Sequence, residues 1–151
     1  MSNTLDNSSN IVSLNQKIII SAMVAAVFII VSLPYVYDQT SKITTTIIEL
    51  CPSPEGKFIH AIIFFIINYL LMKINNKNGI ESKSDGLMAK YAFMGTLLFF
   101  LLSSNDSYKM TGRLFSGIVN ESGCPEVKGI LVHSLVFLVI LVLMMSFPKD
   151  R

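Results

Sequence analysis

Four long apolar stretches, separated by polar segments, dominate the pattern of the chain. They run from Ile18 to Val36, from Phe58 to Ile74, from Leu87 to Leu102 and from Gly129 to Phe147, with few or no charged residues in each. A helix needs about 17 to 25 predominantly apolar residues to cross a bilayer. The pattern therefore predicts an all-α integral membrane protein with four transmembrane helices.

The amino-acid composition agrees with this prediction and limits the classes of molecule that the protein is expected to bind. The 151 residues are 52% hydrophobic and only 15% charged, which is more apolar than an ordinary soluble domain. The net charge is only +2, and the sequence has no cluster of Lys or Arg residues that could bind the phosphates of a nucleic acid. We therefore expect the lipid bilayer, and no nucleic acid, as a partner.

The first apolar stretch follows Lys17, as the core of a signal peptide would. The stretch is longer than such a core, and Leu33, Pro34 and Tyr35 do not form a small-residue cleavage site. We therefore expect a retained helix.

An internal repeat organises the chain. Ten residues starting at Cys51 align without a gap with ten residues starting at Cys124, and four identities coincide. The matched pairs are Cys51 and Cys124, Pro52 and Pro125, Gly56 and Gly129, and His60 and His133. The same register pairs Phe64 with Phe137 and Met72 with Met145, and upstream Tyr37-x-x-Thr40 matches Tyr108-x-x-Thr111. The repeat indicates a duplicated helical hairpin.

Two copies of a two-span unit lie parallel in a membrane, related by an axis along its normal. We therefore expect two pseudo-symmetric hairpins, with both Cys loops on one face and the termini and central linker on the other. The predicted boundaries are a polar tail over 1–16, disordered or on the membrane surface, a first hairpin over 17–74, a polar linker over 75–86 and a second hairpin over 87–151. Seven Lys and Arg residues fall on the linker face and five in the Cys loops, which favours cytoplasmic termini.

Each Cys loop also holds a short amphipathic stretch. Ile43-x-x-x-Ile47-Ile48 and Leu114-Phe115-x-x-Ile118-Val119 place apolar side chains on one helical face, so we expect an interfacial helix in each loop. A strand is the alternative for the first stretch, because its Thr and Ile residues are β-branched. Tyr35, Tyr37 and Tyr108 are expected to mark the membrane interface on this side.

The two cysteines occupy matched positions on one face. A disulfide between Cys51 and Cys124 is the simplest interpretation, and it requires an oxidising compartment or a dedicated oxidase. Free buried thiols and a redox-active pair are alternatives, although no Cys-x-x-Cys motif is present to poise a redox potential. Pro52 and Pro125 suit the first turn of a helix, and Gly56 and Gly129 allow a neighbouring segment to approach closely.

His60 and His133 are the only histidines, and each lies just inside a predicted membrane helix. Each imidazole could hydrogen-bond its own Cys loop and so close its hairpin. The alternative is that the two face each other and ligate a haem. Two histidines without carboxylates are too few for a zinc or di-iron site, so we expect no metal and, outside the haem alternative, no cofactor.

Asn68 is the other notable polar residue within the predicted spans, and we expect it to bond a neighbouring helix rather than to line a pore. No Asp or Glu within the spans could relay protons. A small pore or transporter is therefore a third interpretation, behind a structural protein and a haem protein.

The succession of a Tyr-x-x-Thr loop, Cys-Pro with a Gly, and a helical His-x-x-x-Phe resembles small multi-pass virion membrane proteins of large nucleocytoplasmic DNA viruses. The resemblance covers both hairpins, at Tyr37 to Phe64 and at Tyr108 to Phe137. It implies a structural place in the virion membrane under the capsid, as a viral inner-membrane or minor capsid component. We expect a non-enzymatic structural protein that docks other membrane or capsid proteins through its two Cys loops. An oligomer is compatible with this interpretation, and no catalytic residue is implied.

Overall fold

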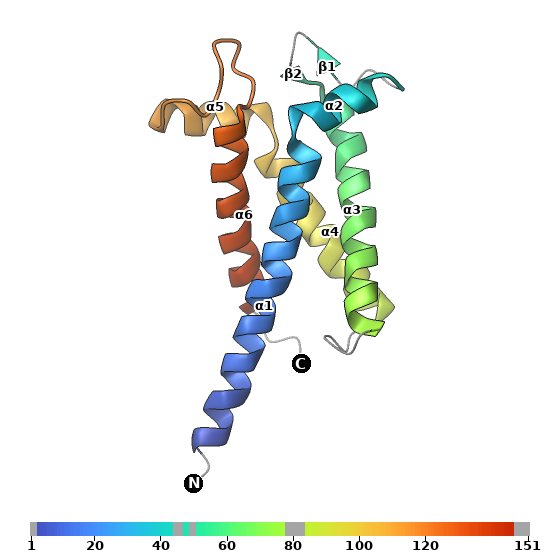
Figure 1. The fold of residues 1–151 in the computed structure, drawn as a ribbon, viewed down its shortest axis with the longest axis vertical. Coiled ribbons are helices and arrows are strands. Elements are labelled where there is room, and N and C mark those ends of the chain that lie inside the picture. Colours follow the sequence, from blue (N-terminus) through green and yellow to red (C-terminus); the bar gives the residue numbers. More distant parts are fainter. Residues whose placement is uncertain (1–2, 44–46, 49–50, 78–83, 147–151) are drawn as a thin grey trace.

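The computed structural model describes residues 3–43, 47–48, 51–77 and 84–146, with side chains from residue 14 onward except those of 47–48. Figure 1 shows the elements in chain order. They are α1 (Asn3–Ser32), α2 (Pro34–Ser41), β1 (Ile47–Ile48), β2 (Cys51–Pro52), α3 (Pro54–Lys77), α4 (Asp85–Leu102), α5 (Asn105–Leu114) and α6 (Val127–Ser146).

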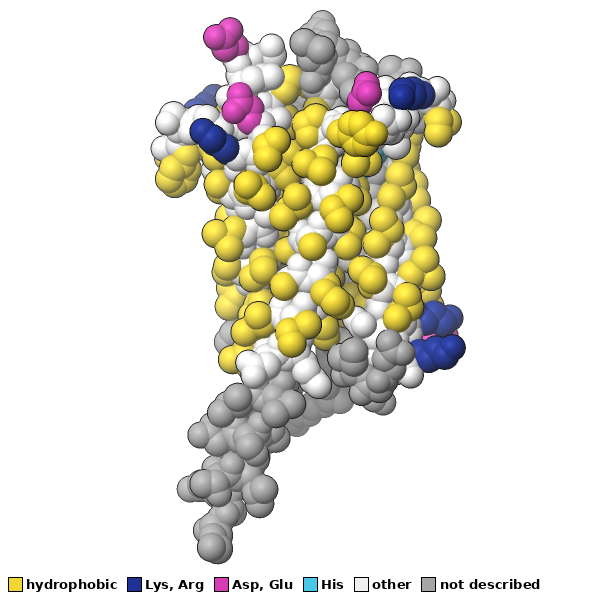
Figure 2. Space-filling model, viewed as in Figure 1, with side chains coloured by type: hydrophobic (Ala, Val, Ile, Leu, Met, Phe, Trp, Pro, Cys, Tyr) yellow, Lys and Arg dark blue, Asp and Glu magenta, His cyan; other side chains and the backbone are white. Residues whose placement is uncertain are grey.

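Within the described residues, four helices are long and apolar enough to cross a membrane. They are Leu14–Ser32 of α1 and the whole of α3, α4 and α6. Figure 2 shows a broad band of hydrophobic side chains around the middle of the molecule, with charged side chains near its two ends. The predicted all-helical protein with four candidate membrane spans is thus confirmed.

The first span ends earlier than predicted, at Ser32 rather than Val36. Leu33 adopts an extended conformation (φ −61°, ψ 137°), and Pro34 starts α2. Proline has no N–H to continue the helical hydrogen bonding, and its ring restricts the residue before it to extended conformations. Pro34 therefore separates the spanning helix from α2.

Three other boundaries also differ from the sequence expectation. Helix α1 already begins at Asn3, whereas the first hairpin was expected to begin at residue 17. The expected polar tail over 1–16 is therefore helical from Asn3 onward. Helix α3 continues to Lys77 and α4 starts at Asp85, which shortens the expected 75–86 linker. Polar residues can extend a spanning helix beyond the bilayer, because the backbone hydrogen bonds propagate independently of hydropathy. Residues 78–83 of the linker lie outside the described part.

Each Cys loop has a short helix, but not at the residues expected to form an interfacial helix. The short helices are α2 and α5, which follow directly on α1 and α4 and lie across the ends of the spanning helices (Figure 1). Ile47–Ile48 is instead a strand that pairs antiparallel with Cys51–Pro52, so the alternative interpretation holds for these two residues. Ile43 lies in a turn, and residues 44–46 and 49–50 lie outside the described part. Ile118 and Val119 follow α5, and Val119 forms a β-bridge with Pro125. The β-branched side chains favour extended backbone at these positions.

The spanning helices pack most extensively between the two halves of the chain. Helix α1 lies mainly against α6, and α3 lies mainly against α4, whereas the α1–α3 and α4–α6 contacts are smaller. Each close pair therefore combines one helix from each repeat. The two repeats therefore contact each other along both pairs of helices, rather than packing as two separate hairpins.

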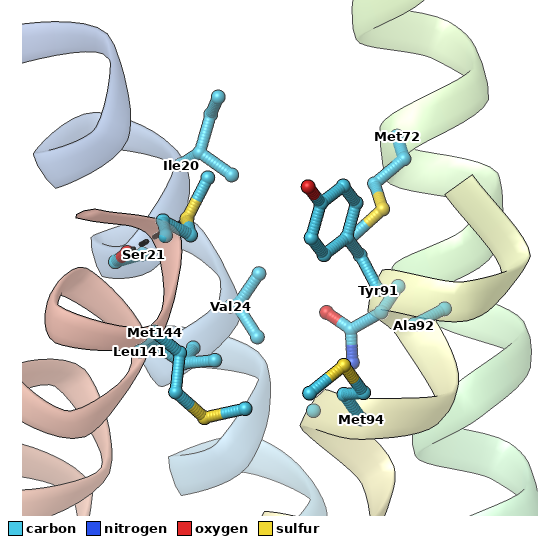
Figure 3. Close-up of a pocket in the computed structure, with 12 residues that line it drawn as sticks. Ile20, Ser21, Val24, Met72, Tyr91, Ala92, Met94, Leu141 and Met144 are labelled. Atoms are coloured by element: carbon cyan, nitrogen blue, oxygen red, sulfur yellow. Dashed lines mark hydrogen bonds between the residues drawn. The ribbon is translucent and has the colours of Figure 1, made fainter. Parts of the chain in front are cut away.

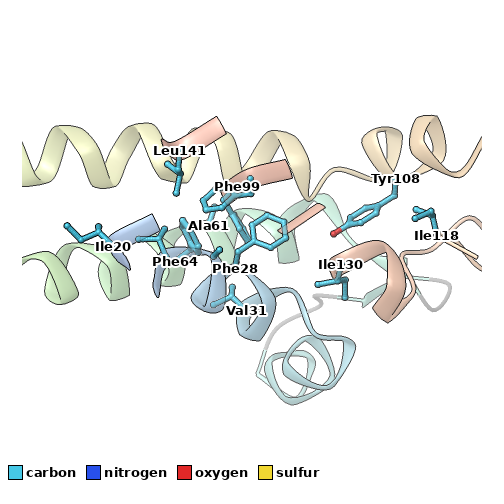
Figure 4. Packing of buried hydrophobic residues seen from close by; sticks show 13 residues of the cluster. Ile20, Phe28, Val31, Ala61, Phe64, Phe99, Tyr108, Ile118, Ile130 and Leu141 are labelled. Carbon is cyan, nitrogen blue, oxygen red and sulfur yellow. The ribbon is translucent and has the colours of Figure 1, made fainter. Parts of the chain in front are cut away.

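Four phenylalanines form the centre of this packing (Figure 4). Phe28, Phe64, Phe99 and Phe137 are all fully buried. The Phe28 and Phe137 rings lie 5.0 Å apart between α1 and α6, and the Phe64 and Phe99 rings lie 4.5 Å apart between α3 and α4. Edge-to-face contacts of 5.3 Å and 5.8 Å connect these two pairs. Aromatic pairs in this range contribute about 0.5–1.5 kcal/mol each beyond area burial.

Candidate functional site

A disulfide between Cys51 and Cys124 joins the two loops on one face of the bundle. The Cα atoms lie 5.2 Å apart and the bond spans 73 residues of sequence. Cys51 belongs to β2, while Cys124 stands in a turn whose backbone N–H donates to the Asn120 side-chain oxygen at 2.9 Å. The predicted pairing is confirmed, and with only two cysteines in the chain neither is a free thiol.

Beneath the disulfide, His60 connects α3 to both preceding helices. Its Nδ1 lies 2.8 Å from the carbonyl oxygen of Val31 in α1, and its Nε2 lies 2.9 Å from the hydroxyl of Thr40 in α2. The Tyr37 ring stacks on the imidazole with centroids 3.7 Å apart. We call Tyr37, Thr40 and His60 the first clasp.

His133 makes the same three kinds of contact in the second half of the chain. Its Nδ1 lies 2.8 Å from the carbonyl oxygen of Leu102 in α4, and its Nε2 lies 2.7 Å from the Thr111 hydroxyl in α5. The Tyr108 ring stacks on it at 4.1 Å. Tyr108, Thr111 and His133 form the second clasp. The interpretation in which each histidine closes its own hairpin is confirmed.

The two acceptor carbonyls explain why a histidine is needed here. Val31 and Leu102 lie in the last turns of α1 and α4, where backbone carbonyls have no partner within the helix. A carbonyl without a hydrogen bond is costly in a membrane, where water is scarce. Each imidazole supplies the missing donor from a neighbouring helix.

The same geometry fixes which nitrogen of each imidazole carries the proton. A carbonyl oxygen can only accept, so Nδ1 donates in both clasps. In the neutral ring Nε2 then accepts the threonine hydroxyl proton. The Thr111 hydroxyl also lies 2.6 Å from the Ser107 carbonyl oxygen, so its single proton has two competing acceptors.

The clasp tyrosines are buried and do not mark the membrane interface as expected. Tyr37 and Tyr108 are only 3% and 1% exposed, whereas Tyr35 is 69% exposed. Burial raises the pKa of Tyr37 above the usual phenol range, and the nearby Tyr108 raises it further. Burial likewise raises the pKa of Tyr108. Their rings stack on the imidazoles inside the protein and expose almost no surface to the surroundings.

The prolines and glycines of the repeat lie at or just before the N-terminal ends of α3 and α6, the helices that contain the two histidines. Pro52 lies in β2, and Pro125 forms the β-bridge with Val119, so neither stands inside a helix. The backbone N–H of Gly56 donates to the Ser53 hydroxyl at 2.9 Å, which caps α3. At Gly129, a β-carbon would collide with the backbone oxygen of Ile118. The predicted close approach is confirmed at Gly129.

Lys57 is the one charged residue among the buried side chains that the structure describes, at 6% exposure. It lies in the first turn of α3, near Asp106 and Lys109 of α5. Sequence reasoning included Lys57 only among the five positively charged residues of the Cys loops. Its matched residue, Ile130, is fully buried.

The arrangement offers no ready-made ligand set for iron. Both nitrogens of each imidazole already have hydrogen-bond partners, so an iron at Nε2 would displace a threonine hydroxyl. Within the described residues, no three His, Cys, Asp or Glu side chains gather as a metal site would require. The hydrogen bonds of the two imidazoles hold the ends of α1 and α4.

Sequence reasoning identified His60 and His133 but gave Thr40 and Thr111 no role. A signal was available, because both threonines and both tyrosines recur at matched positions before each Cys-Pro. Such recurrence indicates a shared contact, but only the structure shows which groups meet.

No family model matches the chain, and neither the curated proteins nor the solved structures with which it was compared include a match.

Proposed function

We propose that this protein is a non-enzymatic, structural membrane protein whose two disulfide-joined Cys loops dock other membrane or capsid proteins. In this proposal the fold consists of two parallel, pseudo-symmetric hairpins with α2 and α5 as interfacial helices. The termini are cytoplasmic. The membrane is a virion membrane, in line with the resemblance of the repeated motif.

Equivalent contacts at matched positions support the pseudo-symmetric arrangement. The two clasps use the same three residue types, and the close helix pairs α1–α6 and α3–α4 exchange under the repeat. On α5, Met110 and Leu114 are exposed one turn apart while Tyr108 is buried, which suits a helix lying at a bilayer surface.

The disulfide is the observation that carries the docking role. It ties together two loops that are 73 residues apart in sequence, directly above the buried clasps. In the second loop, residues 113–117 and 120–122 are exposed on this fixed base. A preorganised surface loses less conformational entropy when it binds a partner.

A photo-crosslinking residue at exposed Ser122 tests this proposal in native membranes. The expected result is a small set of discrete protein adducts, which disappear in the Cys51→Ser, Cys124→Ser variant although it still inserts. The matched control places the same residue at Ile66, which is 49% exposed on α3 and should yield lipid adducts only.

Two results would contradict the proposal. One is lipid-only labelling at both positions, which would leave the Cys loops without a protein partner. The other is a Soret absorbance band in the purified protein, which would favour the haem interpretation despite the hydrogen bonds at both imidazoles.

A further inference from the structure

A small cavity of about 50 Å³ lies between the two close helix pairs, toward the end of the bundle opposite the disulfide. Figure 3 shows Ile20, Val24 and Leu141 on one side of it and Tyr91, Ala92 and Met72 on the other. All four spanning helices contribute to the lining. The cavity lies outside the clasps and the Cys loops.

The cavity is open at Gly95, a position where the two repeats differ. In the register that pairs Tyr37 with Tyr108, Gly95 matches Val24, and both residues line the cavity. A β-carbon built at Gly95 would have no atom within 4 Å. The missing side chain at Gly95 therefore contributes to the open space.

Asn68 gives this cavity a buried polar atom without a hydrogen-bond partner. Its side chain is 1% exposed, and its Nδ2 donates to the Phe64 carbonyl oxygen at 2.7 Å, within its own helix rather than to a neighbouring one as expected. That bond fixes the orientation of the amide, since a carbonyl can only accept. The Oδ1 atom is buried and has no hydrogen-bond partner. The matched residue in the second repeat is Leu141, so the polar group belongs to one half only.

The lining around Asn68 is mostly apolar, and the other polar side chains in it are Ser21 and Tyr91. A buried water needs two to four polar partners, and apolar cavities stay dry. The lining includes the thioethers of Met72, Met94 and Met144, and the Ser21 hydroxyl is directed to the sulfur of Met145 at 3.5 Å. Methionine side chains are flexible and adapt to the shape of an apolar ligand.

We propose that this cavity binds a hydroxyl-bearing apolar molecule from the membrane, whose O–H donates to Asn68 Oδ1. An alcohol supplies the single donor that Asn68 lacks, while its alkyl part contacts the methionines. Asn68 lies nine residues before Lys77, so the bound hydroxyl stands roughly 14 Å from the end of α3, within the hydrocarbon region.

Two small constitutional isomers test the proposal, ethanol and dimethyl ether, which match in composition and differ in the O–H donor. The full-length protein in lipid nanodiscs, labelled with ¹³C in its methionine methyl groups, is titrated with each compound at equal bilayer mole fraction. We expect ethanol to shift the Met72, Met94, Met144 and Met145 methyl signals saturably, and to bind about tenfold more tightly than the ether. The Met110 signal, from an exposed site on α5, serves as the internal control.

Two variants separate the hydrogen bond from the space. Asn68→Leu copies the residue at the matched position and is expected to remove the preference for the alcohol. Gly95→Val copies the matched Val24, fills the cavity and should abolish the saturable shifts of both compounds. Equal affinities of the isomers for the wild-type protein, an unchanged alcohol preference in Asn68→Leu, or magnetisation transfer from water only would each overturn the proposal.

Discussion

The Nδ1 atom of His60 lies 2.8 Å from the carbonyl oxygen of Val31, the residue before the last residue of α1. This bond crosses from one spanning helix to the next at the point where the chain leaves the membrane. It supplies a donor to a carbonyl that the helix itself leaves without one. His133 and Leu102 stand in the same relationship at the end of α4.

Replacing a clasp histidine should therefore destabilise the bundle. His60→Leu leaves the Val31 carbonyl and the Thr40 hydroxyl without this partner, and we expect the free energy of unfolding to fall by about 1–3 kcal/mol. His133→Leu should behave alike. Denaturant unfolding in detergent, followed by circular dichroism, measures the change. The lipid-exposed substitution Ile66→Ala is the control, and equal stability of His60→Leu and this control would contradict the role of the clasp.

The buried tyrosines predict a loss of stability at alkaline pH. The pKa of Tyr37 and Tyr108 in the folded protein is raised above the unfolded value of about 10. Below pH 10 both tyrosines are neutral in the folded and in the unfolded protein, so their contribution to the free energy of unfolding is fully present. Above pH 10 the unfolded tyrosines ionise first, so the free energy of unfolding should decrease as the pH rises. Phenolate absorbance should show that these two tyrosines titrate only on unfolding.

The double variant Tyr37→Phe, Tyr108→Phe should lose this part of the pH dependence. Tyr35→Phe should retain it, because Tyr35 is largely exposed. Identical alkaline profiles of the double variant and the wild type would show that other groups cause the transition.

Two glycines in spanning helices should respond in opposite directions to alanine. At Gly129 a methyl group would meet the backbone oxygen of Ile118, so the loop must shift and Gly129→Ala should cost about 1–3 kcal/mol. At Gly95 the methyl group enters open space, so Gly95→Ala should stabilise by up to about 1 kcal/mol. Thermal unfolding of both variants in one detergent measures the difference. The reverse order would contradict the packing at both sites.

The chain has two N-glycosylation sequons in the Cys loops, Asn105-Asp106-Ser107 and Asn120-Glu121-Ser122, and the proposed orientation predicts which one is modified. Asn120-Glu121-Ser122 is exposed on the Cys face, whereas Asn105 begins α5 and its side-chain oxygen is buried. Translation into microsomes should therefore add one glycan, removable by endoglycosidase. Asn120→Gln should abolish the glycan, and Asn105→Gln should not. Complete lack of modification, with protease access to the Cys loops from outside the vesicle, would place those loops on the cytoplasmic side.

Sequence periodicity predicted some elements well and others poorly, for identifiable reasons. The four spans follow from apolar length, and Cys51 pairs with Cys124 because the repeat puts both before equivalent helices. The loop helices were misplaced because Ile43 to Ile48 fits both a helical and an extended pattern. Pro34 ended the first span four residues before the predicted limit. Tyr37 was misjudged because an aromatic residue near a span end has the same pattern at an interface and in a core.

By itself, the sequence determined the four candidate spans and the matched cysteines and histidines, because hydropathy and an ungapped repeat are properties of the chain alone. The tertiary structure decided that α1 packs mainly on α6, that Thr40 and Thr111 meet the imidazoles, and that Gly95 leaves a cavity beside Asn68. Lipid satisfies an apolar helix face as well as another helix does, so hydropathy cannot select a neighbour. Side-chain volume and the unpaired donors and acceptors make that choice, and they act only when the helices are in contact.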